Sequence, residues 1–290
     1  SNHRDIILDS GFLSILLIDE GMDTVEIAIG DNLLIYPWIK KLVRVNKSFI
    51  VQRALSMRQM LEASGLMSRY IHHTIKEKIK SIWIAQREGR AKDSDDKTQS
   101  SILKMLNMGG DSDILTNLMS LNIVPVSISY EFDPCDFLKA QEFQQKRDNP
   151  DFVKSKRDDL LNMETGILNN KGRVHFTIAN PINQALSKLD RNMEKNELYS
   201  AIACIIDKEI YKHYRFYPCN YVAYDMITGT KRFNEMYSQK EKMQFEEYLQ
   251  GQLDKIVLPD NNKDIPYLRE KILDMYTNPL KNYLANKDEE

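Results

Sequence analysis

Cysteine is scarce in this chain, which holds three in 290 residues, at Cys135, Cys204 and Cys219. Three thiols are too few for a disulfide framework, and their spacing is not that of a zinc site. The sequence therefore predicts a protein of a reducing compartment.

Long apolar runs are also missing. The longest run near the start, residues 11–18, stops at Asp19 and is shorter than the roughly 18 residues that a spanning helix needs. No secretory signal pattern is present. Charge of one sign is not in excess either, because 40 Lys and Arg stand against 42 Asp and Glu, for a net charge of −2. This balance argues against a protein whose whole surface binds nucleic acid.

The hydrophobic pattern alternates between strand-like and helix-like periods, which favours an α/β fold with a mixed central sheet flanked by helices. We expect strands at residues 25–29, 48–51, 82–85, 121–128 and 174–178. Helices are expected at residues 6–18, 33–43 and 56–80, the last of which starts with a capping box at Ser56.

Helical segments dominate after residue 182. We expect them at residues 197–211, 237–256 and 265–284, with a break in the last near Pro279. The sequence therefore predicts two domains, an α/β unit at residues 1–182 and a helical extension at residues 183–290.

His3 is the first candidate for chemistry, because imidazole is the usual general base near neutral pH. Asp5 and Asp9 follow it closely, and a carboxylate could hold one ring nitrogen so that the other accepts a proton. A histidine near two aspartates is also common on protein surfaces, so the pattern alone does not predict catalysis.

A basic cluster follows the third expected strand and consists of Arg87, Glu88, Gly89, Arg90 and Lys92. Strand ends in α/β sheets are where ligands bind, and a glycine lets backbone approach a ligand closely. Arginine and lysine side chains could bind a phosphate or carboxylate there. A solvated charged loop would have the same composition.

Four short blocks, taken in order, resemble the motifs of the glycerolipid acyltransferase superfamily. They are Asn2-His3-Arg4; Gly30-Asp31-Asn32-Leu33 with Phe49-Ile50-Val51-Gln52-Arg53; Glu88-Gly89-Arg90; and Val124-Pro125-Val126. The segment 123–131, with its Tyr130-Glu131, is particularly similar to the glycerol-3-phosphate acyltransferase version of the fourth block, and the resemblance spans residues 1–182. The family pattern places an aspartate where this chain has Leu8, and the third block is one residue short. A one-residue insertion after His3 would bring Asp9 into the orienting place, with Asp5 as the alternative.

The resemblance implies an acyltransferase-type fold and transfer of an acyl group in one step. His3 would be the base and Asp9 its partner. The residues expected to bind the phosphate of the acceptor are Arg53, Glu88, Gly89, Arg90 and Lys92. Pro125 would shape the acyl or thioester pocket, and the resemblance calls for no metal and no cofactor.

The implied co-substrate is an acyl thioester of coenzyme A or of acyl carrier protein. The implied acceptor is 1-acylglycerol-3-phosphate, with glycerol-3-phosphate or a lyso-aminolipid as alternatives, and no nucleic acid is involved. The expected location is the cytoplasmic side of a bacterial cell membrane, peripheral or anchored by a segment that precedes this sequence. A non-catalytic lipid-binding protein of the same fold is the other hypothesis.

Two aromatic segments have more than one interpretation. Residues 33–44 join Tyr36 and Trp38 to Lys40, Lys41 and Arg44, which suits either a membrane interface or a buried helix. Residues 211–217 alternate aromatic and basic side chains, which suits stacking on nucleic acid, but the blocks above favour a packed helix end.

Overall fold

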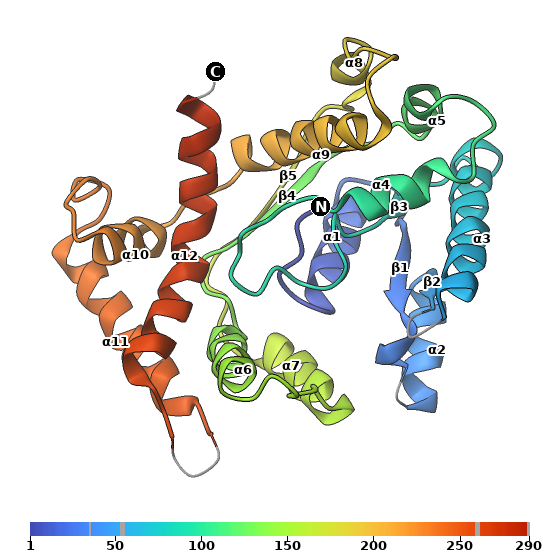
Figure 1. Cartoon of the computed structure of the whole chain (residues 1–290). Coiled ribbons are helices and arrows are strands. Elements are labelled where there is room, and N and C mark those ends of the chain that lie inside the picture. The colour runs from blue at the N-terminus through green and yellow to red at the C-terminus, as the bar shows by residue number, and fades with distance from the viewer. Residues whose placement is uncertain (35, 53–55, 259–261, 289–290) are drawn as a thin grey trace.

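The computed structural model describes the whole chain except residues 35, 53–55, 259–261 and 289–290. The described part is mixed α/β and about 56% helical, with small sheets and a helical C-terminal part (Figure 1). The α/β class predicted from the sequence is therefore confirmed.

The strands form two sheets. In the first, β1 (Glu26–Gly30) lies between β2 (Ser48–Val51) and β3 (Ile82–Trp83), and both pairings are parallel. In the second, β4 (Val126–Tyr130) pairs with β5 (Val174–Ile178) in antiparallel fashion. The expected single mixed sheet is thus divided in two.

The first residues of the chain lie between these sheets. On one side, the backbone of Ser1 bonds to Ile84 at 3.2 Å and to Gln86 at 2.8 Å, just beyond β3. On the other side, the Asn2 side chain accepts from the Ile128 N–H at 2.8 Å and donates to the Ile128 carbonyl at 2.9 Å. A side-chain amide therefore takes the place of a strand backbone and connects the two sheets.

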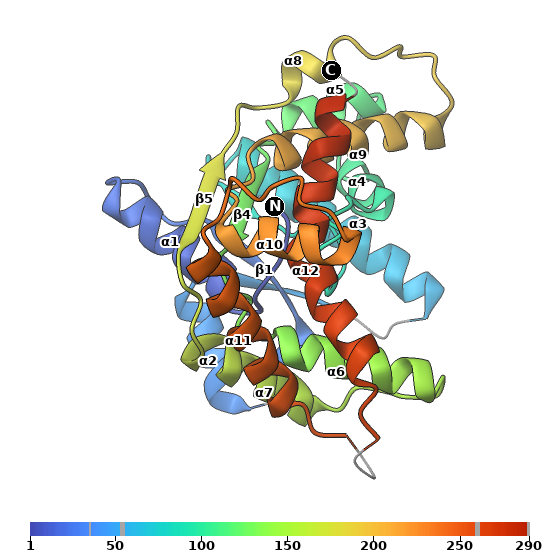
Figure 2. The ribbon, with the colours of Figure 1, turned by 90° about the vertical axis from the view of Figure 1, so that its left-hand side faces the viewer.

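Helices surround both sheets. Before residue 130 they are α1 (Leu8–Asp19), the 3₁₀ turn η1 (Asp31–Leu33), α2 (Pro37–Val45), α3 (Met57–Lys76), α4 (Ser100–Asn107) and α5 (Ile114–Ser120). After it come α6 (Asp136–Asp148), α7 (Lys156–Leu168), α8 (Asn183–Leu186), α9 (Lys195–Lys212), α10 (Pro218–Thr228), α11 (Gln239–Lys255) and α12 (Ile265–Asp288). Figure 1 shows α10 to α12 on the opposite side of the molecule from α2 and α3, and Figure 2 shows them from the front.

Two local expectations are wrong. The strand expected at residues 121–128 begins only at Val126, because Leu121 caps the end of α5 and Asn122 has a φ of 50°, which turns the chain away. The break expected at Pro279 does not occur, and α12 runs through it. Buried side chains on both sides, Tyr276 and Leu280, hold the helix together against the roughly 3 kcal/mol cost of an internal proline.

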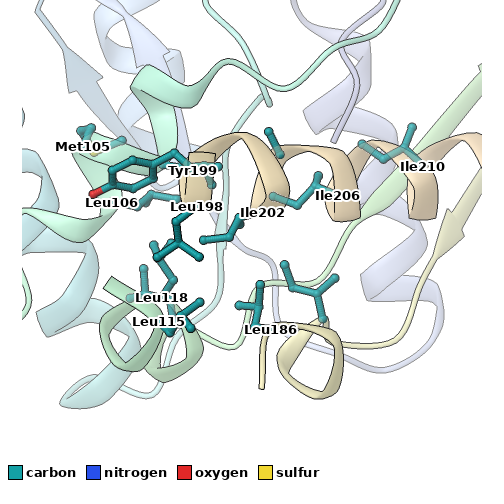
Figure 3. Packing of buried hydrophobic residues seen from close by; sticks show 14 of the residues in the cluster. Met105, Leu106, Leu115, Leu118, Leu186, Leu198, Tyr199, Ile202, Ile206 and Ile210 are labelled. Carbon is teal, nitrogen blue, oxygen red and sulfur yellow. The ribbon is translucent and has the colours of Figure 1, made fainter. Parts of the chain in front are cut away.

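Two hydrophobic clusters form the core. The first surrounds α9, whose Leu198, Ile202 and Ile206 pack against α4, α5 and α8 (Figure 3). The second joins α10, α11 and α12 to Ala140 of α6. Both clusters contain side chains from before and after residue 182, and the domain boundary predicted there stays a prediction.

Candidate active site

His3 and Asp9 are in direct contact. Nδ1 of His3 lies 2.8 Å from Oδ2 of Asp9, and the side chain of Asp9 is fully buried while that of His3 is 14% exposed. Asp9 sits in the first turn of α1, which begins at Leu8. The helix therefore holds the carboxylate against Nδ1 of the imidazole.

Asp5 has a different structural role from Asp9. Its Oδ1 accepts from the N–H groups of Ile7 and Leu8 at 2.9 and 2.8 Å, so it satisfies free donors at the start of α1. Burial, followed by the negative charge of Asp9, raises the pKa of Asp5, whereas the positive charge of Arg90 opposes this. The carboxylate that contacts His3 is thus Asp9.

Four hydrogen bonds hold the carboxylate of Asp9. Besides His3, its Oδ2 accepts from the backbone N–H of Arg4 at 2.7 Å and of Asp5 at 3.1 Å. Its Oδ1 accepts from the Tyr130 hydroxyl at 3.1 Å. Burial would raise the pKa of Asp9, but the bond from His3 and these backbone donors hold it below its ordinary value. Asp9 is therefore ionised near neutral pH.

The other ring nitrogen of His3 is the one that could accept a proton. Because Asp9 occupies Nδ1, Nε2 is the basic position. The Trp83 ring packs edge-on against the imidazole at 5.7 Å, and its own N–H donates to the Ser1 hydroxyl at 3.0 Å. A carboxylate, an oriented imidazole and an aromatic wall together form the arrangement of a general base.

A buried ion pair supports this turn of the chain. Arg4 contacts Asp96 through two N–O distances of 2.8 and 2.5 Å, and both side chains are buried. Tyr214 donates to the Asp96 carboxylate and Tyr211 to its backbone carbonyl. The Arg4 carbonyl accepts from Lys139 at 3.1 Å, so α6 and the end of α9 both hold the segment that carries His3.

Arg90 lies on the Asp5 side of this centre. One of its terminal nitrogens donates to Asn162 of α7 at 3.0 Å. The other is buried, and no hydrogen-bond partner for it is found within the described part of the chain. A buried guanidinium nitrogen without a partner is costly, and an anion would satisfy it.

Lys92 is held by a different helix. Its ammonium contacts Glu142 of α6, which also accepts from Lys146 at 3.0 Å. Burial lowers the pKa of Lys92 to about 8, although Glu142 opposes this. Arg90 and Lys92 thus contact α7 and α6 respectively.

The remaining candidates are more scattered. Gly89 has a φ of 68°, a turn conformation that favours glycine, and the Glu88 N–H donates to Gln99 at 2.7 Å. Pro125 is buried directly before β4, at the opposite end of that strand from Tyr130 and so about 16 Å from it at 3.3 Å per residue. Arg53 lies outside the described residues.

Several residues of this centre were not assigned a role from the sequence. Tyr130 belongs to the fourth block without a role of its own, and Asp96 lies outside all four blocks. Nothing in the sequence connects Asp96 to Tyr214, which is 118 residues away. The tract 211–217 is a packed helix end, as expected, because Tyr214 and Tyr217 are buried.

The described residues contain neither a membrane-spanning helix nor a cluster of metal-binding side chains. None of the described helices combines the length and apolar character needed to cross a membrane. Among the same residues, no group of three or more His, Cys, Asp or Glu side chains is placed to hold a metal ion. Comparison of the chain with protein-family models and with curated proteins gives no match.

Proposed function

We propose that the protein is an O-acyltransferase that moves a fatty acyl group from an acyl thioester to a hydroxyl of a glycerolipid acceptor. The observation that carries this proposal is the contact between His3 and the buried carboxylate of Asp9 at 2.8 Å. It leaves Nε2 of a partly exposed imidazole as a base beside the blocks that resemble the glycerolipid acyltransferases. The fold of that superfamily, as opposed to the α/β class alone, is part of the proposal.

The proposed reaction has one chemical step. Nε2 of His3 takes the proton of the acceptor hydroxyl while the hydroxyl oxygen attacks the thioester carbonyl carbon. The carbon–sulfur bond breaks, and the thiolate leaves with the electron pair and is protonated by the imidazolium or by water. A positioned base contributes about 10²- to 10⁴-fold to such a step. Asp9 stabilises the imidazolium that forms.

The acceptor we propose carries a phosphate, as 1-acylglycerol-3-phosphate does. The buried, unpartnered nitrogen of Arg90 supports this, and so does Lys92, on which the positive charges of Lys146 and Lys154 also act. Glu142 now lies between Lys92 and Lys146. We propose that the acceptor phosphate competes with this carboxylate for Lys92.

A membrane surface on the cytoplasmic side of a bacterial cell is the place where we propose that the enzyme meets its lipid. In α2, Ile39 and Val43 are buried, whereas Val45 and the cations Lys40, Lys41 and Arg44 are exposed, as is Tyr36 directly before the helix. The last turns of α1 expose Ile15, Leu16 and Ile18, followed by Met22. Exposed apolar side chains beside cations are typical of proteins that bind anionic lipid surfaces.

The proposal is tested by thiol release from acyl-CoA and from acylated carrier protein. The acceptors offered are 1-acylglycerol-3-phosphate, glycerol-3-phosphate and a lyso-aminolipid. We expect acceptor-dependent release that falls by about 10²- to 10⁴-fold in His3→Ala and also falls in Asp9→Asn. His213→Ala is the matched control, because the His213 ring bonds to the Glu209 carbonyl at 2.7 Å, one turn earlier in the chain.

Equal release by wild type and His3→Ala would contradict the role of His3 as base. If the protein binds lysolipid vesicles but releases no thiol with any donor and acceptor, the enzymatic proposal is wrong and lipid binding without catalysis is the better description.

A further inference from the structure

Tyr130 is the last residue of β4 and lies opposite Val174 of β5. It is 8% exposed, its ring lies 6.5 Å from that of Phe12 of α1, and its hydroxyl donates to Oδ1 of Asp9 at 3.1 Å. The strand and the helix thus fix the ring on two sides. The hydroxyl has little freedom to go elsewhere.

The bonds to Asp9 are divided between its two oxygens. Oδ2 receives His3 and the two backbone N–H groups, whereas Oδ1 receives Tyr130. The bonds to Oδ2 already oppose rotation of the carboxylate plane, because Oδ2 lies off the Cβ–Cγ bond and would move with it. The bond to Oδ1 adds a second anchor on the other side of that bond and so narrows the range of angles at which Oδ2 meets Nδ1 of His3.

The same bond also affects where the proton lies. A donor to Oδ1 withdraws charge from the carboxylate, which makes Asp9 a weaker base and leaves the proton on Nδ1 of His3. Burial, followed by the neighbouring charges of Asp9 and Asp5, raises the pKa of Tyr130. The hydroxyl therefore keeps its proton and remains a donor at every pH at which a histidine base would act.

We propose that Tyr130 is a positioning residue that locks the Asp9 carboxylate, and through it the imidazole of His3, in the orientation that leaves Nε2 free as a base. The expected effect of Tyr130 on turnover rests on the proposed function. The restraint that Tyr130 places on the Asp9 carboxylate, which we call the lock, does not, because it is a property of the free protein.

The chain offers a matched comparison in Tyr248. Its hydroxyl donates to the buried carboxylate of Asp136 at 2.7 Å, within the cluster formed by α10, α11 and α12. Tyr130→Phe and Tyr248→Phe each remove one hydroxyl from a buried carboxylate, and each keeps the ring. Only the first removes it from a carboxylate that touches His3.

The lock is tested by NMR of protein carrying ¹⁵N-labelled histidine. We expect wild type to show a low-field Nδ1 proton on His3 that exchanges slowly with water, and Tyr130→Phe to speed this exchange at least tenfold. Tyr248→Phe should leave the exchange unchanged. If Tyr130→Phe and Tyr248→Phe exchange alike, the lock does not exist, whatever the activity of the protein.

Turnover gives the second readout. In Tyr130→Phe we expect kcat to fall roughly tenfold with acceptor KM nearly unchanged, and the acid limb of the pH–rate profile to move to higher pH, because Asp9 then stabilises the imidazolium more strongly. A 3-fluorotyrosine placed at position 130 is a stronger donor and should move the limb the other way. The 3-fluorotyrosine protein also tests the proposal if Tyr130→Phe does not fold. If the acid limb stays at the wild-type pH in both variants, the role of Tyr130 is overturned. A wild type without turnover would overturn only the proposed function.

Discussion

The carboxylate of Asp96 holds the guanidinium of Arg4 through contacts of 2.8 and 2.5 Å, and both side chains are buried. The Arg4 backbone N–H donates to Asp9, so this ion pair lies one residue from the proposed base. The burial would by itself lower the pKa of Arg4, but Asp96 more than compensates and the pKa is raised. Asp96 therefore fixes the turn between His3 and α1.

Removing Asp96 should be strongly destabilising. Asp96→Ala leaves the buried cation of Arg4 without its partner, and breaking such a pair costs about 3–5 kcal/mol. Urea unfolding measures this loss. The control is Glu62→Ala, whose partner Arg58 lies 3.1 Å away with both side chains more than half exposed, and which should cost at most about 1 kcal/mol. Equal losses of unfolding free energy in the two variants would show that the buried pair stabilises the protein no more than an exposed pair does.

Two helical glycines should respond to alanine with opposite signs. A Cβ on Gly166 of α7 would lie 2.1 Å from Oδ2 of Asp5, whereas a Cβ on Gly251 of α11 meets nothing within 4 Å. Gly251→Ala should stabilise the protein by up to about 1 kcal/mol, from helix propensity alone. Gly166→Ala gains the same propensity, but it pushes a methyl group against the buried Asp5 side chain. The overpacking costs about 1–3 kcal/mol and the lost cap at the start of α1 about 1 kcal/mol, which together outweigh the gain. Thermal unfolding distinguishes them, and a Gly166→Ala protein more stable than wild type would contradict the close approach.

Lys92 should make acceptor binding depend on pH. Its pKa is lowered to about 8 by burial, so it loses its charge as the pH rises through 8, well below the ordinary value near 10.5. We expect the KM for a phosphate acceptor to rise several-fold between pH 7.5 and about 9.5 in wild type. Lys92→Arg stays charged over this range and should show a flat KM. A parallel rise in both would assign the effect to another group.

Replacing Arg90 should weaken binding of the acceptor and leave binding of the acyl donor unchanged. Losing a charged hydrogen bond costs about 1.5–3 kcal/mol, which raises the KM for a phosphate acceptor roughly 10- to 100-fold in Arg90→Ala. The KM for acyl-CoA should not change. Arg173→Ala is the control, because Arg173 pairs with Glu131 at 2.9 Å with its side chain 63% exposed. If Arg90→Ala keeps its affinity for phosphate acceptors, Arg90 does not bind the phosphate.

Much of the fold could be predicted from local patterns. The strands at Ser48–Val51 and Val174–Ile178 have the expected bounds, and the capping box at Ser56 starts α3 where expected. Branched or aromatic side chains make these strands recognisable by themselves. Pro279 could not be placed this way, because local sequence predicts a break there and only the packing of α12 against its neighbours prevents it.

The site was predictable only where its partners are close in sequence. His3 and Asp9 are six residues apart, and spacing together with the resemblance favours this pair, with Asp5 as the alternative until the structure shows the contact. The partners of Arg4, Arg90 and Lys92 lie 92, 72 and 50 residues away. Charge alone does not choose among 42 acidic residues, so these contacts required the structure.

The amide of Asn2, which bonds to Ile128 across 126 residues, has a consequence for the order of folding. Contacts that close long loops carry a larger entropic cost and form slowly. During synthesis, residues 2–9 emerge before β4, Asp96 and Tyr214 exist to hold them. The turn that bears the proposed base is therefore among the first parts of this sequence to be made and among the last to reach its final shape, so that a partly folded chain would carry no active base.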